Sequence, residues 1–353
     1  MTASLAPSPA GVMDFVLPPE LSASEPPEAR GIERDEVRLL VSGHGDPVHT
    51  RFSDLARFLR AGDLLVVNTS ATMPAAVDAV LADHRLAVVH FSTRLDDGTW
   101  VVELRKRNAS GPILDAEAGA EVTLAGGGSL RLAGPQHGIA RGGVRLWRAD
   151  VTGVGEVTKY LCAHGRPITY GYLHGRWPLS DYQPVFATAP GSAEMPSAGR
   201  PFSTRLVTEL VAGGVGFAPV LLHAGVSSLE VGEAPQPERF EVTATTSRLV
   251  NEARQAGGRI IAVGTTATRA IETVADVDGQ VRPGYGWTHL VLGPNRPARA
   301  VDGIITGWHE PGASHLLLLE AVVGPCRVER AYAEALQEGY LWHEFGDSAL
   351  LLR

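Results

Sequence analysis

A glycine and two threonines stand at the end of an apolar run in residues 260–272, IIAVGTTATRAIE. The pattern predicts a buried strand over residues 260–263, a turn at Gly264, and a helix that Thr265 or Thr266 can cap. The free N–H groups at the start of such a helix favour an anion or the polar edge of a ligand. The stretch is therefore a candidate phosphate or nucleoside site.

Arg269 and Glu272 give the same stretch a second interpretation. They stand three residues apart on the expected helix, a spacing at which opposite charges pair on a helix surface. In that interpretation the junction is a capped strand-to-helix turn that binds nothing. The residues alone leave both interpretations open.

A histidine follows the strand expected over residues 302–308, DGIITGW. Open α/β sheets bind ligands beyond the carboxyl ends of their strands, so His309 is a candidate ligand-site residue. The alternative is a turn histidine held by hydrogen bonds. Ser314 can cap the helix that follows. The spacing of His309 and His315 does not match a metal pair, and no metal is expected.

Further polar candidates lie beside apolar runs and in one long loop. Asn68 follows a strand expected over residues 64–67, and Asp347 stands in a Gly-Asp turn near the end of the chain. Asn and Asp are favoured in turns, so each has a structural interpretation beside a ligand-binding one. Tyr182 and Gln183 lie in a loop rich in proline and glycine, and long irregular segments in a compact body are often functional.

Basic residues gather in the middle of the chain. With Trp147 beside them, they are either a face that follows phosphates or the solvated face of a strand. These residues are Arg105, Lys106, Arg107, Arg141, Arg145 and Arg148.

The composition restricts the class of protein. The 353 residues carry a net charge of −8, which argues against a protein that coats nucleic acid by charge alone but leaves room for a tRNA enzyme with a local basic face. Cys162 and Cys326 form neither a zinc spacing nor a disulfide framework, so a reduced, cytoplasmic protein is expected. No signal peptide and no bilayer-spanning stretch is recognised, and no membrane association is expected.

Two patterns alternate along the chain. Residues 76–150 contain short apolar runs between turn clusters, without a helical period, which predicts an inserted antiparallel β-barrel domain. Residues 1–75 and 151–353 mix strand and helix patterns, which predicts a discontinuous α/β (α+β) body. Within the body, a strand is also expected over residues 287–293.

The motifs, taken in order, carry a family resemblance. They are DFVLPPEL, HTRFSDLARFLRAGDLLVVN, YQPVFATAPGS, PSAGRPF, LLHAG, VGTTATRAIE, ITGWHEPGAS and GYLWHEFGDSALLL, and they span nearly the whole chain. Together they resemble the S-adenosylmethionine:tRNA ribosyltransferase-isomerase family of the queuosine pathway, with VGTTATRAIE the most specific. The resemblance implies a two-domain enzyme with a β-barrel inserted into an α/β body, which agrees with the pattern of the residues.

The resemblance also implies a reaction. S-adenosylmethionine serves as co-substrate and ribosyl donor, and no metal takes part. A base removes a proton from the ribosyl carbon beside the sulfonium, adenine and methionine leave, and the rearranged ribosyl group is transferred to 7-aminomethyl-7-deazaguanine in the tRNA anticodon loop, which gives epoxyqueuosine. Such a reaction needs a base near the sulfonium and a dry pocket.

Site residues follow from the resemblance as expectations. His309 and His223 are the candidates for proton handling, with Glu238 as the carboxylate rival and Arg269 beside the nucleoside. The residues expected to bind S-adenosylmethionine are Gly264, Thr265, Thr266, Gln183, Tyr182, Asp347 and Asn68.

The chain departs from the family motifs in several places. Ala71 and Ala76 stand where family members have arginines, and Arg200 stands where they have leucine. The family's A-A-P-T-A-G reads EMPSAG here, which adds Glu194. The lost arginines would weaken an anionic RNA partner most.

Two alternatives to the tRNA reaction therefore stay open. One is a diverged paralogue that uses S-adenosylmethionine on a small-molecule acceptor. The other is a catalytically inactive homologue that binds a nucleoside or RNA. A monomer is expected.

Overall fold

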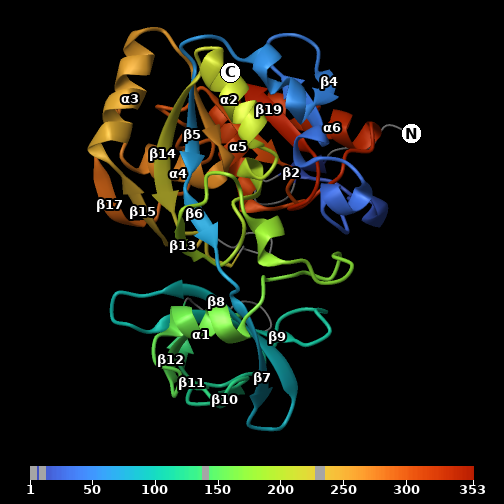
Figure 1. Cartoon of the computed structure of the whole chain (residues 1–353), viewed down its shortest axis with the longest axis vertical. Coiled ribbons are helices and arrows are strands. Elements are labelled where there is room, and N and C mark those ends of the chain that lie inside the picture. Colours follow the sequence, from blue (N-terminus) through green and yellow to red (C-terminus); the bar gives the residue numbers. More distant parts are fainter. Residues whose placement is uncertain (1–5, 8–12, 137–142, 227–234) are drawn as a thin grey trace.

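A mixed sheet of nine strands forms the body of the protein, and a closed six-stranded antiparallel β-barrel projects from one end of it (Figure 1). The computed structural model describes residues 6–7, 13–136, 143–226 and 235–353. The predicted fold class, an α/β (α+β) body with an antiparallel barrel, is confirmed.

The sheet is parallel at its centre, and its outer strands pair antiparallel except for β19 and β3, which run parallel. The neighbouring strands β14, β5, β16 and β18 run parallel, so their carboxyl ends meet at one edge. In spatial order the strands are β17 (Gly284–Thr288), β15 (Glu238–Val242), β14 (Gly216–Leu222), β5 (Leu64–Asn68), β16 (Ile260–Val263), β18 (Gly303–Gly307), β19 (Ser348–Leu352), β3 (Arg38–Ser42) and β4 (Val48–Arg51).

The central strands are buried on both faces. Leu64 and Val66 of β5 belong to one hydrophobic cluster, while Leu65 and Val67 belong to another. Successive side chains of a strand point to opposite faces, so an unbroken apolar run predicts a strand covered on both sides. One cluster includes side chains of α3, α4, α5 and α6, and the other includes side chains of α2 and η4.

The helices and short elements connect these strands. The α-helices are α1 (Val157–His164), α2 (Thr204–Ala212), α3 (Ala244–Gln255), α4 (Gly264–Thr273), α5 (Ser314–Val323) and α6 (Pro325–Gln337). The 3-10 helices are η1 (Pro19–Leu21), η2 (Pro27–Arg30), η3 (Arg34–Glu36), η4 (Phe52–Phe58), η5 (Leu179–Tyr182) and η6 (Ser197–Gly199). Two further strand pairs join β1 (Ala6–Pro7) with β2 (Met13–Asp14), and β6 (Ser70–Thr72) with β13 (Ala189–Ser192).

The barrel has a hydrophobic core of its own. Along β10, Val122 and Leu124 are buried while Glu121 and Thr123 are exposed, the alternation expected of a strand with one face inside. Helix α1 contributes Tyr160 to the same hydrophobic cluster. The strands are β7 (Ala76–Leu81), β8 (Leu86–Arg94), β9 (Trp100–Lys106), β10 (Glu121–Leu124), β11 (Ser129–Pro135) and β12 (Leu146–Thr152).

Two of the basic residues in the barrel are buried rather than displayed on its surface. Arg105 and Arg145 both donate to the carboxylate of Glu103, at 3.2 and 3.1 Å, and the Nδ1 atom of His90 lies 3.5 Å from the same carboxylate. Both proposed surface interpretations are therefore wrong for these two arginines, because Glu103 holds them inside. Arg141 lies outside the described residues.

The chain leaves and re-enters the body at one place. The N–H of Ala76 donates to the carbonyl of Arg166, and the N–H of Arg166 donates to the carbonyl of Ala76, both at 2.9 Å. The outgoing and returning segments are thus paired where they meet the body. The predicted division at residues 75/76 and 150/151 stays a prediction.

The predicted strand over residues 287–293 is wrong beyond Thr288. Strand β17 ends at Thr288, where its pairing with β15 ends. The apolar side chains of Leu290 and Leu292, which suggested a strand, instead line a cavity.

Candidate active site

A cavity of about 400 Å³ opens at the carboxyl ends of the central strands, where Arg105 of the barrel also reaches its wall. This volume lies within the usual range of small-molecule sites, and the position is the one at which open α/β sheets bind ligands. Residues that follow three of these strands line it: Gly264, Thr265 and Thr266 after β16, His309 and Glu310 after β18, and Ala224, Gly225 and Val226 after β14.

The turn after β16 is closely fitted. Gly264 has a φ of +91°, and a Cβ atom there would lie 3.2 Å from the Cβ of Ala198. Glycine is therefore required both for the backbone conformation and for the close approach. Helix α4 starts at Gly264, and no side chain caps it, so the predicted threonine cap is wrong. Thr265 and Thr266 line the cavity instead.

Asn68, at the end of β5, fixes this turn to the neighbouring strand. Its Nδ2 donates to the carbonyl of Leu222 at 2.8 Å and to Oγ1 of Thr266 at 3.2 Å. Its Oδ1 accepts from the N–H groups of Ser70 and Leu222 at 3.1 and 3.0 Å. Asn68 thus positions Thr266 and does not itself line the cavity.

Replacing Asn68 by aspartate is expected to lower the free energy of unfolding by about 1–3 kcal/mol, because a carboxylate would face the carbonyl of Leu222 without a donor. Chemical denaturation of the two proteins measures the difference. Asn108→Asp is the matched control, since its Oδ1 only accepts from Ser110 in an exposed turn and aspartate accepts equally well. An equal loss in both variants would contradict the positioning role.

Arg269 and Glu238 form a buried ion pair at the cavity wall. Arg269 NH1 donates to Glu238, and its Nε and NH2 donate to the carbonyls of Leu290 and Gln236, each at 3.2 Å. Burial raises the pKa of Glu238, and the Arg269 charge opposes that shift. The predicted surface pair of Arg269 with Glu272 is therefore wrong.

Glu272 has a different role, inside the body. Its carboxylate accepts hydrogen bonds from the backbone N–H groups of Arg299, Ala300 and Val301, and Arg296 also donates to it. These bonds fix the chain segment that precedes β18. Glu272 is 1 % exposed, so this network replaces its hydration.

Two histidines stack on the floor of the cavity. The rings of His309 and His315 lie 4.5 Å apart at an angle of 4°, and Nε2 of His309 is 3.0 Å from Oγ1 of Thr306. Burial lowers the pKa of His309 well below its ordinary value, with further contributions from His315 and His343. Burial also lowers the pKa of His315 to about 4. Both rings are therefore neutral at physiological pH, and an unprotonated imidazole can accept a proton.

Ser314 does not cap the helix that carries His315. It is the first residue of α5, which begins after Ala313 without a side-chain cap. The predicted cap is wrong because the chain reaches the helix one residue earlier than expected.

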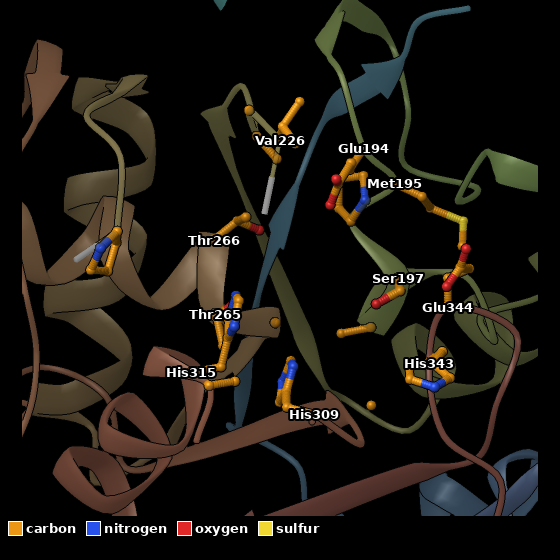
Figure 2. A pocket seen from close by; sticks show the side chains of 18 of the residues that line it. Glu194, Met195, Ser197, Val226, Thr265, Thr266, His309, His315, His343 and Glu344 are labelled. Carbon is orange, nitrogen blue, oxygen red and sulfur yellow. The ribbon is translucent and has the colours of Figure 1, made fainter. Parts of the chain in front are cut away.

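The wall opposite Thr265 and Thr266 carries residues that the sequence did not single out as a site. Figure 2 shows Glu194, Met195, Ser197 and Glu344 on this side and Thr265, Thr266 and His315 on the other.

An aromatic stack belongs to the same wall. Tyr170 stacks on Tyr172, whose ring lies 3.9 Å from that of His343. Tyr172 donates to Glu344 at 2.6 Å, and burial raises the pKa of Glu344 to about 7. Tyr170 and Tyr172 belong to no helix or strand, so no periodicity marked them.

Three of the predicted residues are held by backbone or side-chain partners away from the cavity lining. Gln183 exchanges two hydrogen bonds with the backbone of Thr72, at 3.0 and 2.8 Å. Asp347 accepts from the N–H groups of Arg38 and Leu341, both at 2.8 Å. His223 bonds to Oγ of Ser70 at 2.8 Å, and burial lowers its pKa.

The other predicted residues, apart from Asn68, line the cavity together. They are His309, Glu238, Arg269, Gly264, Thr265, Thr266 and Tyr182. Within the described part of the chain, no group of three or more His, Cys, Asp or Glu side chains is placed to hold a metal ion. No described helix combines the length and the apolar character needed to cross a membrane.

Comparisons with known proteins place the chain in a family. Residues 11–351 match the model of a family described as queuosine biosynthesis protein. An S-adenosylmethionine:tRNA ribosyltransferase-isomerase of Symbiobacterium thermophilum is 34% identical over 350 residues, which cover 96% of this chain and 98% of that protein. An enzyme of the same name from Moorella thermoacetica is 33% identical over 358 residues, with 96% and 98% covered.

A solved structure agrees with these matches. The crystal structure of an S-adenosylmethionine tRNA ribosyltransferase from Thermotoga maritima superposes with a TM-score of 0.53 and 28% sequence identity, covering 96% of this chain and 99% of that one. The chain therefore belongs to the queuosine biosynthesis protein family and, like these relatives, is an enzyme of the transferase and isomerase type.

Proposed function

We propose that the protein transfers and isomerises the ribosyl group of S-adenosylmethionine onto 7-aminomethyl-7-deazaguanine in tRNA, to give epoxyqueuosine with release of adenine and methionine. The observation that carries the proposal is the cavity at the strand ends, which joins the Gly264–Thr266 turn to a neutral His309. The names of the relatives supply the substrates.

The cavity supports this reaction by its size and its composition. A volume of about 400 Å³ suits a nucleoside with an amino-acid side arm. Leu290, Leu292 and Leu318 add apolar surface that excludes water from the reacting atoms. The backbone N–H groups at the start of α4 have no side-chain cap and are available to donate to a ligand edge.

His309 is the residue that we assign to proton abstraction. The sulfonium acidifies the adjacent ribosyl carbon, and a neutral imidazole in the same cavity accepts that proton. Thr306 orients the ring through its hydrogen bond to Nε2. Glu238 is engaged with Arg269 and with the N–H of Gly225, which assigns it to holding the wall rather than to proton transfer.

The test is the release of adenine and methionine from S-adenosylmethionine, with and without tRNA that carries 7-aminomethyl-7-deazaguanine. We expect release only with this tRNA, accompanied by the modified base in the tRNA digest. The matched control is the same tRNA with an unmodified guanine at that position.

Other outcomes would separate the alternatives. Saturable binding of S-adenosylmethionine without release, with or without tRNA, would contradict the proposal and indicate a binding protein. Release that depends on a small amine but not on tRNA would instead identify a different acceptor. Measurement of the queuosine content of tRNA in a deletion strain gives the same distinction in cells, since unchanged content would exclude the tRNA reaction.

A further inference from the structure

The two walls of the cavity differ in chemistry. One wall carries Thr265, Thr266 and His315, whose side chains are neutral at physiological pH, and the other carries the carboxyl groups of Glu194 and Glu344 (Figure 2). A ligand that spans the cavity therefore meets neutral polar side chains on one side and two carboxyl groups on the other, where the guanidinium of Arg105 also lies over the ring of Tyr170. This asymmetry suits a reaction of two substrates, each held by its own wall.

The acidic wall also contains a stack of aromatic rings. The rings of Tyr170 and Tyr172 lie 6.1 Å apart at 28°, and those of Tyr172 and His343 lie 3.9 Å apart at 10°. His343 covers one face of Tyr172 and Arg105 lies over the ring of Tyr170, so a planar heterocycle would stack on a face that these groups leave open, with about 1–3 kcal/mol gained per base. Tyr170, Tyr172 and His343 all line the cavity.

Glu344 lacks a cationic partner within the described residues. Tyr172 donates to it, but no Arg, Lys or His nitrogen of those residues forms an ion pair with its carboxylate. Burial raises its pKa to about 7, and the nearby carboxyl groups of Glu194 and Glu310 add to the shift. A partly buried carboxyl group of this kind gains most from a ligand that brings a positive charge.

Glu194 places a second carboxyl group at the other end of the tyrosine stack. It accepts a hydrogen bond from the hydroxyl of Tyr170, as Glu344 does from Tyr172. Its carboxyl group is the one that departs from the family motif given in the sequence analysis. Both carboxyl groups are thus held at the edge of a ring on which a heterocycle would stack.

Tyr182 adds a polar group that has no partner. The residue lines the cavity and is 2 % exposed, and its hydroxyl forms no hydrogen bond to any described residue. Buried polar atoms are nearly always paired, so this hydroxyl is available to a hydrogen-bonding group of a ligand in the cavity.

We propose that Glu194 and Glu344, together with the Tyr170–Tyr172–His343 stack, form the acceptor subsite and select a planar heterocycle that carries a primary ammonium group. The ring stacks on the aromatic wall and the ammonium binds between the carboxylates. The proposed function identifies this heterocycle as 7-aminomethyl-7-deazaguanine, and the inference rests on it in this respect. The opposite wall is then left to S-adenosylmethionine.

The test measures the binding of two free bases by calorimetry: 7-aminomethyl-7-deazaguanine and its neutral analogue 7-methyl-7-deazaguanine. The wild-type protein is expected to bind the cationic base about 10–100-fold more tightly, the range for a charge-assisted hydrogen bond. Glu344→Gln keeps the acceptor for Tyr172 and should reduce this ratio to near one. Glu194→Gln should reduce it by about 10-fold.

The control is Glu117→Gln, which removes the same charge from an exposed position on the barrel. It should leave the ratio unchanged, and thermal melting of all variants verifies their folding. In turnover assays Glu344→Gln should raise KM for the acceptor and leave KM for S-adenosylmethionine within about twofold, since the two substrates use different walls.

The outcomes distinguish this subsite from the reaction itself. A ratio that is unchanged in both glutamine variants, or no binding of the cationic base to the wild-type protein at millimolar concentration, would overturn the subsite even if tRNA-dependent adenine release is found. A ratio that collapses in the variants, in a protein that releases no adenine with tRNA, would support the subsite while the proposed reaction fails.

Discussion

Replacing His309 by glutamine is expected to lower kcat for adenine release by about 10²–10⁴-fold, the usual contribution of a positioned general base. Glutamine is of similar size and can keep the hydrogen bond to Thr306, but it cannot accept the proton from the ribosyl carbon. Binding of S-adenosylmethionine, measured by calorimetry, should change less than about threefold, because the loss is confined to the transition state.

The same substitution at His223 separates the two histidine candidates. His223 bonds to Ser70 and does not line the cavity, so His223→Gln should retain kcat within about threefold. A large loss in His223→Gln together with full activity in His309→Gln would assign the base to His223 and contradict our assignment.

The dependence of kcat on pH gives an independent test of His309 as the general base. Because burial holds its pKa well below the ordinary 6.5, the ring stays neutral as the pH falls through 6.5. The kcat of the wild-type enzyme should therefore show no loss at that point and should decrease only at lower pH, as the ring becomes protonated. A decrease in kcat centred near 6.5 would indicate a base with an ordinary histidine pKa.

Replacing Glu103 by alanine is expected to lower the free energy of unfolding by about 3–5 kcal/mol, the usual effect of removing one partner from a buried ion pair. Glu103 is fully buried, and the change leaves Arg105 and Arg145 in the barrel core without their shared carboxylate. Denaturant unfolding of wild type and variant measures the difference.

Asp115→Ala is the matched control for this prediction. Asp115 pairs with Arg85 on the exposed surface of the barrel domain, where an ion pair contributes less than about 1 kcal/mol. Equal losses in the two variants would contradict the importance of burial.

The contribution of Glu103 to the free energy of unfolding should also depend on pH. Burial would raise its pKa, but His90, Arg105 and Arg145 outweigh this and hold the pKa below its ordinary value of 4.5. A carboxyl group with a depressed pKa contributes its stability above the unfolded-state pKa and loses it as the pH falls through the folded-state pKa. The difference between wild type and Glu103→Ala should therefore persist down to about pH 4.5 and shrink only below it.

The sequence predicted those features that depend on local patterns. The apolar run in residues 260–263 is strand β16, and the short runs between turn clusters form the barrel, because period and turn chemistry are encoded within a few residues. Ser203 caps α2 by accepting a hydrogen bond from the N–H of Leu206, and serine is among the residues preferred at that position.

Pairings between distant segments could not be predicted in the same way. Arg269 was expected to pair within its helix, but its partner Glu238 is on strand β15. Thr266 was expected to cap a helix, but its hydroxyl accepts from Asn68, which is 198 positions away. A polar side chain has several possible partners, and only the packing of the sheet decides which one it meets.

The aromatic wall of the cavity could not be predicted from the sequence for the same reason. Tyr172 and His343 stack although they come from separate irregular segments, and neither segment has a period that would place its side chains. The strand ends therefore predicted where the cavity would be, while the composition of its opposite wall was visible only in three dimensions.

The backbone hydrogen bonds between Ala76 and Arg166 join the segment that enters the barrel domain to the segment that leaves it. This pairing has a consequence for how the chain folds. Strand β5 must find β14, and the whole barrel lies between them in the sequence. Closing a long flexible loop costs entropy that grows with its length, but a barrel that has already folded with its two ends joined acts as a short bridge. Early folding of the barrel would therefore bring the two halves of the body together and shorten the search for the central sheet.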